Sequence, residues 1–347
     1  MKSKEYEFTL ATAEDNEAIK NLFEHTNYKS VLDLQFRRGT DPFASFMQED
    51  AGAVVMLLKH KITKDIIAMG ACSFHEVYIN GEIKRGAYLN GLKILPEYQQ
   101  ILSMMPLAFQ TIQEATQSRT DLYYATILQP AKNLQQIFEK KRRNMPIYQK
   151  QCLNTAFIIS PAHSTKGLHL EKGNVDGLDD FYEKHLINYN LAPVNRKMHG
   201  VCDEDFITWR ENGTIIAACA VLNNQSTKNY FLNSYNGILK PLSHFPTRLL
   251  GLPAPPKTGE SVNNASLSLL LFDESVDIPS RARFMKAASS FAREYDMIMI
   301  GLNDTDPTYH AFDKMIHLKY NSYLYTVNWG EVQNINNRPI YLDVAYI

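Results

Sequence analysis

The stretch LNGLKILPEYQQILSMMPLAFQTI, residues 89–112, contains a junction between a strand and a helix of the kind that can bind an anion. An apolar run ends at Leu95, Pro96 interrupts it, and the apolar spacing then becomes helical. Unpaired backbone N–H groups at a helix start can hold a phosphate, and glycines let the ligand approach them. The segment from Gln99 to Met104 contains no glycine. This junction is therefore either a lost ligand loop or an ordinary packed corner.

Other residue types that carry chemistry form no motif. The four cysteines lie far apart and make no metal-ligand pair, and no Walker-type loop or order of serine, histidine and aspartate typical of a triad is present. The basic run from Lys140 to Arg143 is too short and isolated to indicate nucleic-acid binding. We therefore expect no metal site and no nucleic-acid partner.

The composition indicates a soluble globular protein. The chain has 347 residues, of which 45% are hydrophobic and 21% are charged, and its formal net charge is −1. The first ten residues contain no apolar core typical of a signal peptide, and no apolar run is long enough to span a membrane. We expect a cytoplasmic protein without a membrane partner, and the sequence does not indicate its oligomeric state.

The same order of elements occurs twice along the chain. Each copy begins with a strand and an amphipathic helix, YEFTLATAEDNEAIKNLFEHT in the first and LHLEKGNVDGLDDFYEKHLINY in the second. Paired strands follow, and the Asn212-Gly213 turn is typical of a hairpin. The matched pairs IIAMGAC with IIAACAV and FEKK with FDKM favour a duplication. The sequence predicts two α/β domains with mixed sheets, residues 1–160 and 161–347, related by an internal pseudo-repeat.

One segment interrupts this repeat. Residues 237–260 are rich in proline and glycine where the first copy has a short link. Proline density disfavours regular structure, and long irregular insertions are often lids or tethers. The leucines at 249, 250 and 252 favour a lid that packs on the protein.

The order of strands and helices resembles the GNAT superfamily of N-acetyltransferases. The segment LKILPEYQQ, residues 92–100, is similar to that family's fourth strand and its exit. The resemblance extends from Tyr6 to about Phe157 and again from Leu168 to about Trp329. It implies two tandem GNAT-like domains, with acetyl-CoA or coenzyme A as co-substrate.

In this family a glycine-containing loop at the third helix holds the pyrophosphate of the coenzyme. The resemblance places its glycine positions at Leu102 and Met104 in the first copy, where large side chains fill the space. In the second copy it places them at Ser280 and Ala282, which are small. The resemblance thus implies that the second half binds the coenzyme and that the first is degenerate. The candidate coenzyme-binding residues are Phe272, Ser280, Arg281, Ala282, Arg283 and Asn303.

The resemblance also implies the catalytic groups. Asp273 or Glu274, at the end of the second copy's fourth strand, would take the proton of the attacking amine, and Tyr309 would protonate the leaving thiolate. The expected activity is acetyl transfer to an amine of a small molecule or peptide. The competing hypotheses are a non-catalytic binding or scaffold protein that retains the fold, and an aminoacyl transferase fed by charged tRNA, which the net charge disfavours.

Overall fold

The computed structural model describes residues 5–25, 32–140, 142–165, 167–197, 200–223, 225–235, 256–330 and 333–345. Most of the proline-rich segment, for which a lid is predicted, lies outside these residues. The first half contains β1 (Tyr6–Leu10), α1 (Asn16–His25), β2 (Leu32–Arg37), α2 (Pro42–Met47), β3 (Ala53–His60), β4 (Ile66–Ile79), β5 (Glu82–Ile94), the 3-10 helix η3 (Pro96–Met104), α3 (Met105–Thr116), β6 (Leu122–Leu128), α4 (Lys132–Glu139) and β7 (Ile147–Ile159).

The second half repeats this order with shorter elements. It contains β8 (Leu170–Lys172), α5 (Leu178–Leu186), β9 (Ala192–Pro193), β10 (Phe206–Glu211), β11 (Thr214–Leu222), β12 (Asn229–Tyr235), β13 (Asn264–Phe272), α6 (Ile278–Ala288), β14 (Met297–Asn303), the 3-10 helix η10 (Pro307–Lys314) and β15 (Leu318–Asn328). Short 3-10 turns at Ala13–Asp15, Gln117–Arg119, Asp203–Asp205 and Ser289–Ala292 complete the two halves. The predicted hairpin at Asn212-Gly213 is confirmed, since both residues adopt the positive φ angles of a type I′ turn.

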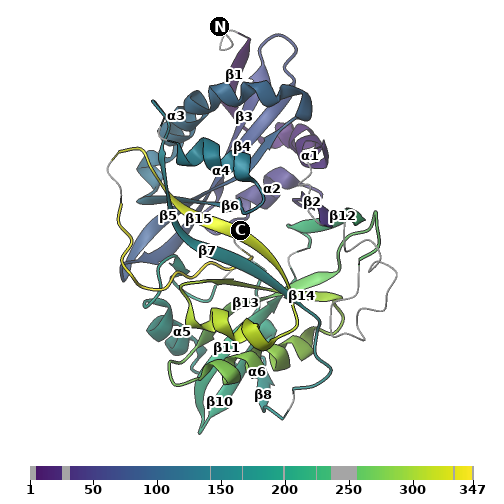
Figure 1. The fold of residues 1–347 in the computed structure, drawn as a ribbon, viewed down its shortest axis with the longest axis vertical. Coiled ribbons are helices and arrows are strands. Elements are labelled where there is room, and N and C mark those ends of the chain that lie inside the picture. Colours follow the sequence, from purple (N-terminus) through teal and green to yellow (C-terminus); the bar gives the residue numbers. More distant parts are fainter. Residues whose placement is uncertain are drawn as a thin grey trace.

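The two halves share one large mixed sheet, with the strand order β1-β3-β4-β5-β6-β15-β7-β14-β13-β11-β10-β8 (Figure 1). The predicted fold class, two mixed α/β copies in tandem, is confirmed.

The last strand of each half pairs with the other half. β15 is antiparallel to β6 over Ser322–Val327, and β7 is antiparallel to β14 over Ile298–Asn303. β7 and β15 also pair with each other along almost their full lengths in the middle of the molecule (Figure 1). The predicted boundary at residue 160 falls in the link after β7, so it separates the halves along the chain but not within the sheet. Whether each half is an independent domain stays a prediction.

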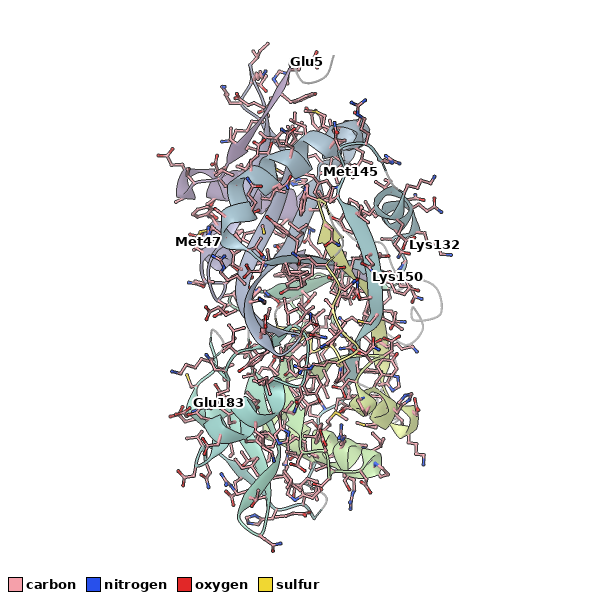
Figure 2. The ribbon with its side chains drawn as sticks, turned by 90° about the vertical axis from the view of Figure 1, so that its left-hand side faces the viewer. Glu5, Met47, Lys132, Met145, Lys150 and Glu183 are labelled. Atoms are coloured by element: carbon pink, nitrogen blue, oxygen red, sulfur yellow. The ribbon has the colours of Figure 1, made fainter. Side chains whose placement is uncertain are left out.

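Helices cover both faces of the sheet in the first half. On β3, Val55 and Leu57 pack with residues of α1 and α2, whereas Met56 packs with residues of α3 and α4. Successive side chains of a strand point to opposite faces, so the two helix pairs lie on opposite faces. Figure 2 agrees, with Met47 of α2 and Lys132 of α4 on opposite sides. The first half therefore has two cores separated by the sheet.

A two-stranded ribbon forms a second link between the halves. β12 of the second half pairs antiparallel with β2 of the first, outside the main sheet. The rings of Phe36 and Tyr230 lie 5.4 Å apart at this ribbon. No helix in the described part of the chain is long and apolar enough to cross a membrane.

Candidate functional site

The first half contains an opening between two parallel strands. The ladder between β5 and β6 covers Gly86–Leu89 and Leu122–Ala125, yet β5 continues to Ile94. A bulge lies just beyond the last paired residues, where the register between β4 and β5 shifts. Gly91 in this bulge has a φ of 63°, and a Cβ there would lie 3.2 Å from the Phe46 ring. Glycine is needed for both reasons, and the bulge directs β5 away from β6.

A cavity of about 400 Å³ lies at this opening, a volume within the usual range of ligand pockets. Its wall includes residues from both faces of the sheet, such as Phe23 of α1 on one face and Phe109 of α3 on the other. The wall is predominantly apolar. Among its residues Leu128, at the carboxyl end of β6, is the most exposed, at 37%. A cavity of this character suits an alkyl chain.

The polar side chains of the wall are concentrated on the α1 side. Arg38, Asn90 and Lys93 line the cavity there. The Asn90 amide donates to the Ser73 hydroxyl at 2.9 Å and to the Tyr88 carbonyl at 3.2 Å, which fixes its orientation. Burial lowers the pKa of Lys93 to about 8.

Arg38 belongs to a buried ionic cluster with Glu49 and Lys228. The Glu49 carboxylate accepts a hydrogen bond from the Arg38 guanidinium at 2.7 Å and lies 3.5 Å from the Lys228 ammonium. All three side chains are at most 8% exposed. Lys228 also donates to the carbonyl of Ala345 at 2.7 Å, so the cluster joins the two halves and the C-terminal segment at the cavity.

The junction after β5 is a packed corner, which is one of the two interpretations that the sequence allowed. It forms the 3-10 helix η3, in which Ile101 and Met104 are buried and line the cavity. Leu102 is half-buried and packs against the core beneath α3. A residue predicted to obstruct a phosphate, Met104, thus forms part of the cavity wall.

The second half has an equivalent bulge, but protein groups fill it. β13 and β14 pair over only three residues, Asn264–Ser266, and the register between β11 and β13 shifts around Leu269. Leu269 has a φ of 52°, unusual for a bulky residue. Its N–H donates to the Asp343 carboxylate at 2.7 Å, and its carbonyl accepts from the Tyr182 hydroxyl. The C-terminal segment therefore occupies the space beside this bulge.

Four of the predicted coenzyme-binding residues, Ser280, Arg281, Ala282 and Arg283, lie in the first half of α6, whereas Phe272 ends β13 and Asn303 ends β14. The Asp277 side chain caps the helix by accepting from the Ser280 N–H at 2.8 Å, and the Arg283 guanidinium donates to the Ser280 hydroxyl. Arg281 is buried, where it donates to Thr308 at 2.8 Å and lies over the Phe272 ring. Ala282 is half-buried and packs against the core of the second half. Their role in coenzyme binding stays a prediction.

The predicted catalytic residues lie at separate places. Asp273 accepts from the hydroxyl and N–H of Ser275, which hold the pKa of its carboxyl below the ordinary value and so weaken it as a base. Glu274 is exposed in the loop after β13. The Tyr309 hydroxyl lies 3.2 Å from the Thr155 hydroxyl. Asn303 donates from its amide to the Ile340 carbonyl, which ties β14 to the C-terminal segment. The catalytic roles of Asp273, Glu274 and Tyr309 and the coenzyme-binding role of Asn303 stay predictions.

Sequence reasoning did not find the cavity. Its wall brings together residues as distant as Phe36, Phe109 and Tyr230, and no local motif connects them. The signal that was available is Gly91 in the interior of a strand, which is typical of a bulge. Among the described residues, no group of three or more histidine, cysteine or acidic side chains is placed to hold a metal ion.

Comparison with known proteins rests on structure alone. No family model matches the sequence, and no curated protein matches it. The structure of Saccharomyces cerevisiae N-myristoyltransferase with bound myristoyl-CoA is similar with a TM-score of 0.60 and 8% identity, covering 97% of this chain and 89% of that one.

A second similar structure is the GCN5-related glucosamine N-acetyltransferase region of a fungal multi-domain β-N-acetylglucosaminidase. Its TM-score is 0.58 at 10% identity, and the match covers 93% of this chain and 38% of that one. At identities this low, the structural similarity shows the fold alone. This chain has the fold of the GCN5-related N-acetyltransferase (GNAT) superfamily, present twice in tandem.

Proposed function

We propose that the protein is an acyl-CoA-dependent N-acyltransferase whose first half holds the acyl group. The observation that carries this proposal is the apolar cavity at the opening between β5 and β6. The protein's similarity in fold to N-acyltransferases, one of them bound to myristoyl-CoA, also supports an N-acyltransferase activity. The proposed acyl group is longer than acetyl, because an acetyl group would leave most of this apolar volume unfilled.

The apolar and the polar residues of the cavity wall would face different parts of the substrates. Ile101, Met104 and Phe109 would contact the alkyl chain, and the bulge at Gly91 lies where the two faces of the cavity meet. Acyl-CoA supplies a thioester, whose C–S bond breaks as the amine nitrogen forms an amide bond. The proton that the nitrogen gives up balances the leaving thiolate, so the products are the amide and coenzyme A as its thiol. Arg38, Asn90 and Lys93 would face the polar acceptor, a small molecule or a peptide.

A matched pair of substitutions tests which half binds the coenzyme. Ala108 and Ala282 are half-buried alanines near the start of α3 and α6, and only Ala108 lines the cavity. Ala108→Trp is expected to fill the cavity and weaken binding of hexadecanoyl-CoA more than about tenfold, the equivalent of two lost methylene contacts. Ala282→Trp is expected to leave binding unchanged. Titration calorimetry on both variants, with a thermal melt to confirm folding, measures these effects.

The opposite pattern would place the coenzyme at residues 272–283, as the sequence predicts, and would refute the first-half site. Tight binding of acetyl-CoA with no gain for longer chains would refute the proposed acyl class. Absence of binding to every acyl-CoA at millimolar concentration would favour the scaffold hypothesis.

A further inference from the structure

Three aromatic rings form the wall of the cavity on the α3 and α4 side. Phe138 of α4 stacks on Tyr148 of β7 with ring centroids 4.6 Å apart, and Phe109 of α3 lies 6.0 Å from each of them. All three line the cavity, and Phe109 and Phe138 are less than 10% exposed. On this side the cavity therefore meets a group of three packed rings among its aliphatic lining.

More protein lies directly behind these rings. Tyr325 of β15, fully buried, is 5.9 Å from Tyr148, and Trp329 is 6.1 Å from Phe109. The Tyr325 hydroxyl donates to the Glu139 carboxylate at 2.7 Å, which holds the backing layer in place. Packed side chains of β15 and the residue after it therefore back the rings of Phe109 and Tyr148 on this side.

The opposite side of the cavity differs in polarity. Arg38 and Lys93 line the cavity there, with the Lys93 ammonium 5.1 Å from the centroid of the Phe23 ring, and the Phe36 and Tyr230 rings of the β2–β12 ribbon line it too. The terminal methyl group of an alkyl chain is more stable against the aromatic rings than beside two cationic side chains, because an alkyl group cannot replace the hydrogen bonds of a buried charge. The chain end therefore belongs on the α3 and α4 side.

We infer that Phe109 and Phe138 set the maximum length of the acyl chain that this protein accepts. The inference rests on the proposed function and adds to it the residues that determine substrate length. Shortening either side chain would extend the cavity towards Tyr148 and Tyr325 and admit longer chains.

Affinities for a series of saturated acyl-CoAs, from butanoyl- to octadecanoyl-CoA, test this inference. Phe138→Ala is expected to move the optimum to longer chains by about two to four carbons, roughly the space of a phenyl ring. Chains beyond the wild-type limit should gain roughly fourfold in affinity for each methylene that becomes buried. Phe138→Leu and Phe109→Leu, which retain more packing, should give smaller shifts in the same direction and provide folded variants if Phe138→Ala is unstable.

Two controls separate the outcomes. Phe312→Leu disturbs a comparable stacked pair, Phe157 and Phe312, in the core of the second half and should leave the length optimum unchanged. Tyr230→Leu enlarges the opposite wall. A shift in Tyr230→Leu but not in the Phe109 and Phe138 variants would overturn the inference, and so would an unchanged optimum in all variants. If the wild-type protein binds no acyl-CoA at all, the proposed function fails first, and the wild-type titration shows this before any variant is made.

Discussion

Residues 1–160 expressed alone are expected to form no cooperatively folded domain. Within the described residues, the ladders of β7 join it to β14 and β15, both of which belong to the second half. β6 would also lose β15, its antiparallel partner over Ser322–Val327, and would expose a long strand edge. The fragment should aggregate or give a proton–nitrogen correlation spectrum without dispersed peaks, and it should show no cooperative thermal transition.

Co-expression of residues 1–160 with 161–347 is the control for this prediction. The cut falls in the link between β7 and β8, so it breaks no helix or strand. The two pieces together are expected to assemble into one soluble complex with a cooperative melt. A monomeric 1–160 fragment with native-like amide protection in β3, β4 and β5 would show that the shared strands are dispensable, and would support the independent domains predicted from the sequence.

Glu49→Ala is expected to lower the free energy of unfolding by about 3–5 kcal/mol, the usual cost of removing one partner from a buried ion pair. The substitution leaves the Arg38 and Lys228 cations buried, with at most 7% of either side chain exposed, and removes the carboxylate between them. Urea denaturation of both proteins measures the difference. Glu7→Ala, which breaks an exposed pair with Lys64, is the control and should have little effect on the midpoint.

This difference should depend on pH in a defined direction. Burial alone would raise the pKa of the Glu49 carboxyl, but Lys228 and Arg38 hold it below its ordinary value of 4.5. The folded-state pKa is thus lower than the unfolded-state pKa. The stabilisation is therefore fully present above the ordinary pKa of 4.5 and is lost as the pH falls through the folded-state pKa. Wild type and Glu49→Ala should therefore differ most near neutral pH and converge in acid. If the difference in the free energy of unfolding stays constant below pH 4.5, packing rather than charge accounts for the lower stability of Glu49→Ala.

Features encoded by short segments could be predicted from the sequence. The Asn212-Gly213 hairpin follows from residues that tolerate positive φ, and Thr12 followed by Asp15 marks the start of the first helix, where the Thr12 N–H donates to the Asp15 carboxylate. The repeat was visible because each copy retains its own order of periodic segments. The glycine-free junction at Gln99–Met104 favoured a packed corner, since its large side chains need burial.

Features that depend on distant partners could not be predicted. The apolar pattern of β15 shows that it is buried but not which strand lies beside it, so the pairing with β6 was invisible. From its place at the start of a helix, Arg281 was expected to be free to bind phosphate. It is instead buried and donates to Thr308, 27 residues further along the chain. Leu269 gave no signal of a bulge, because its left-handed backbone is held by Asp343 and Tyr182 rather than by its own preference.

The shared central strands also set the order in which a newly made chain can mature. β7 ends at residue 159 and β15 at residue 328, so ~170 residues, or on the order of ten to thirty seconds of translation, separate the strand from its partner. Throughout that interval β6 and β7 leave the ribosome with open edges, and the aromatic wall lacks Tyr325 behind it. β6 of the nascent first half stays without its partner until the last strand arrives, so slow synthesis or premature termination would prolong the exposure of this edge and favour aggregation.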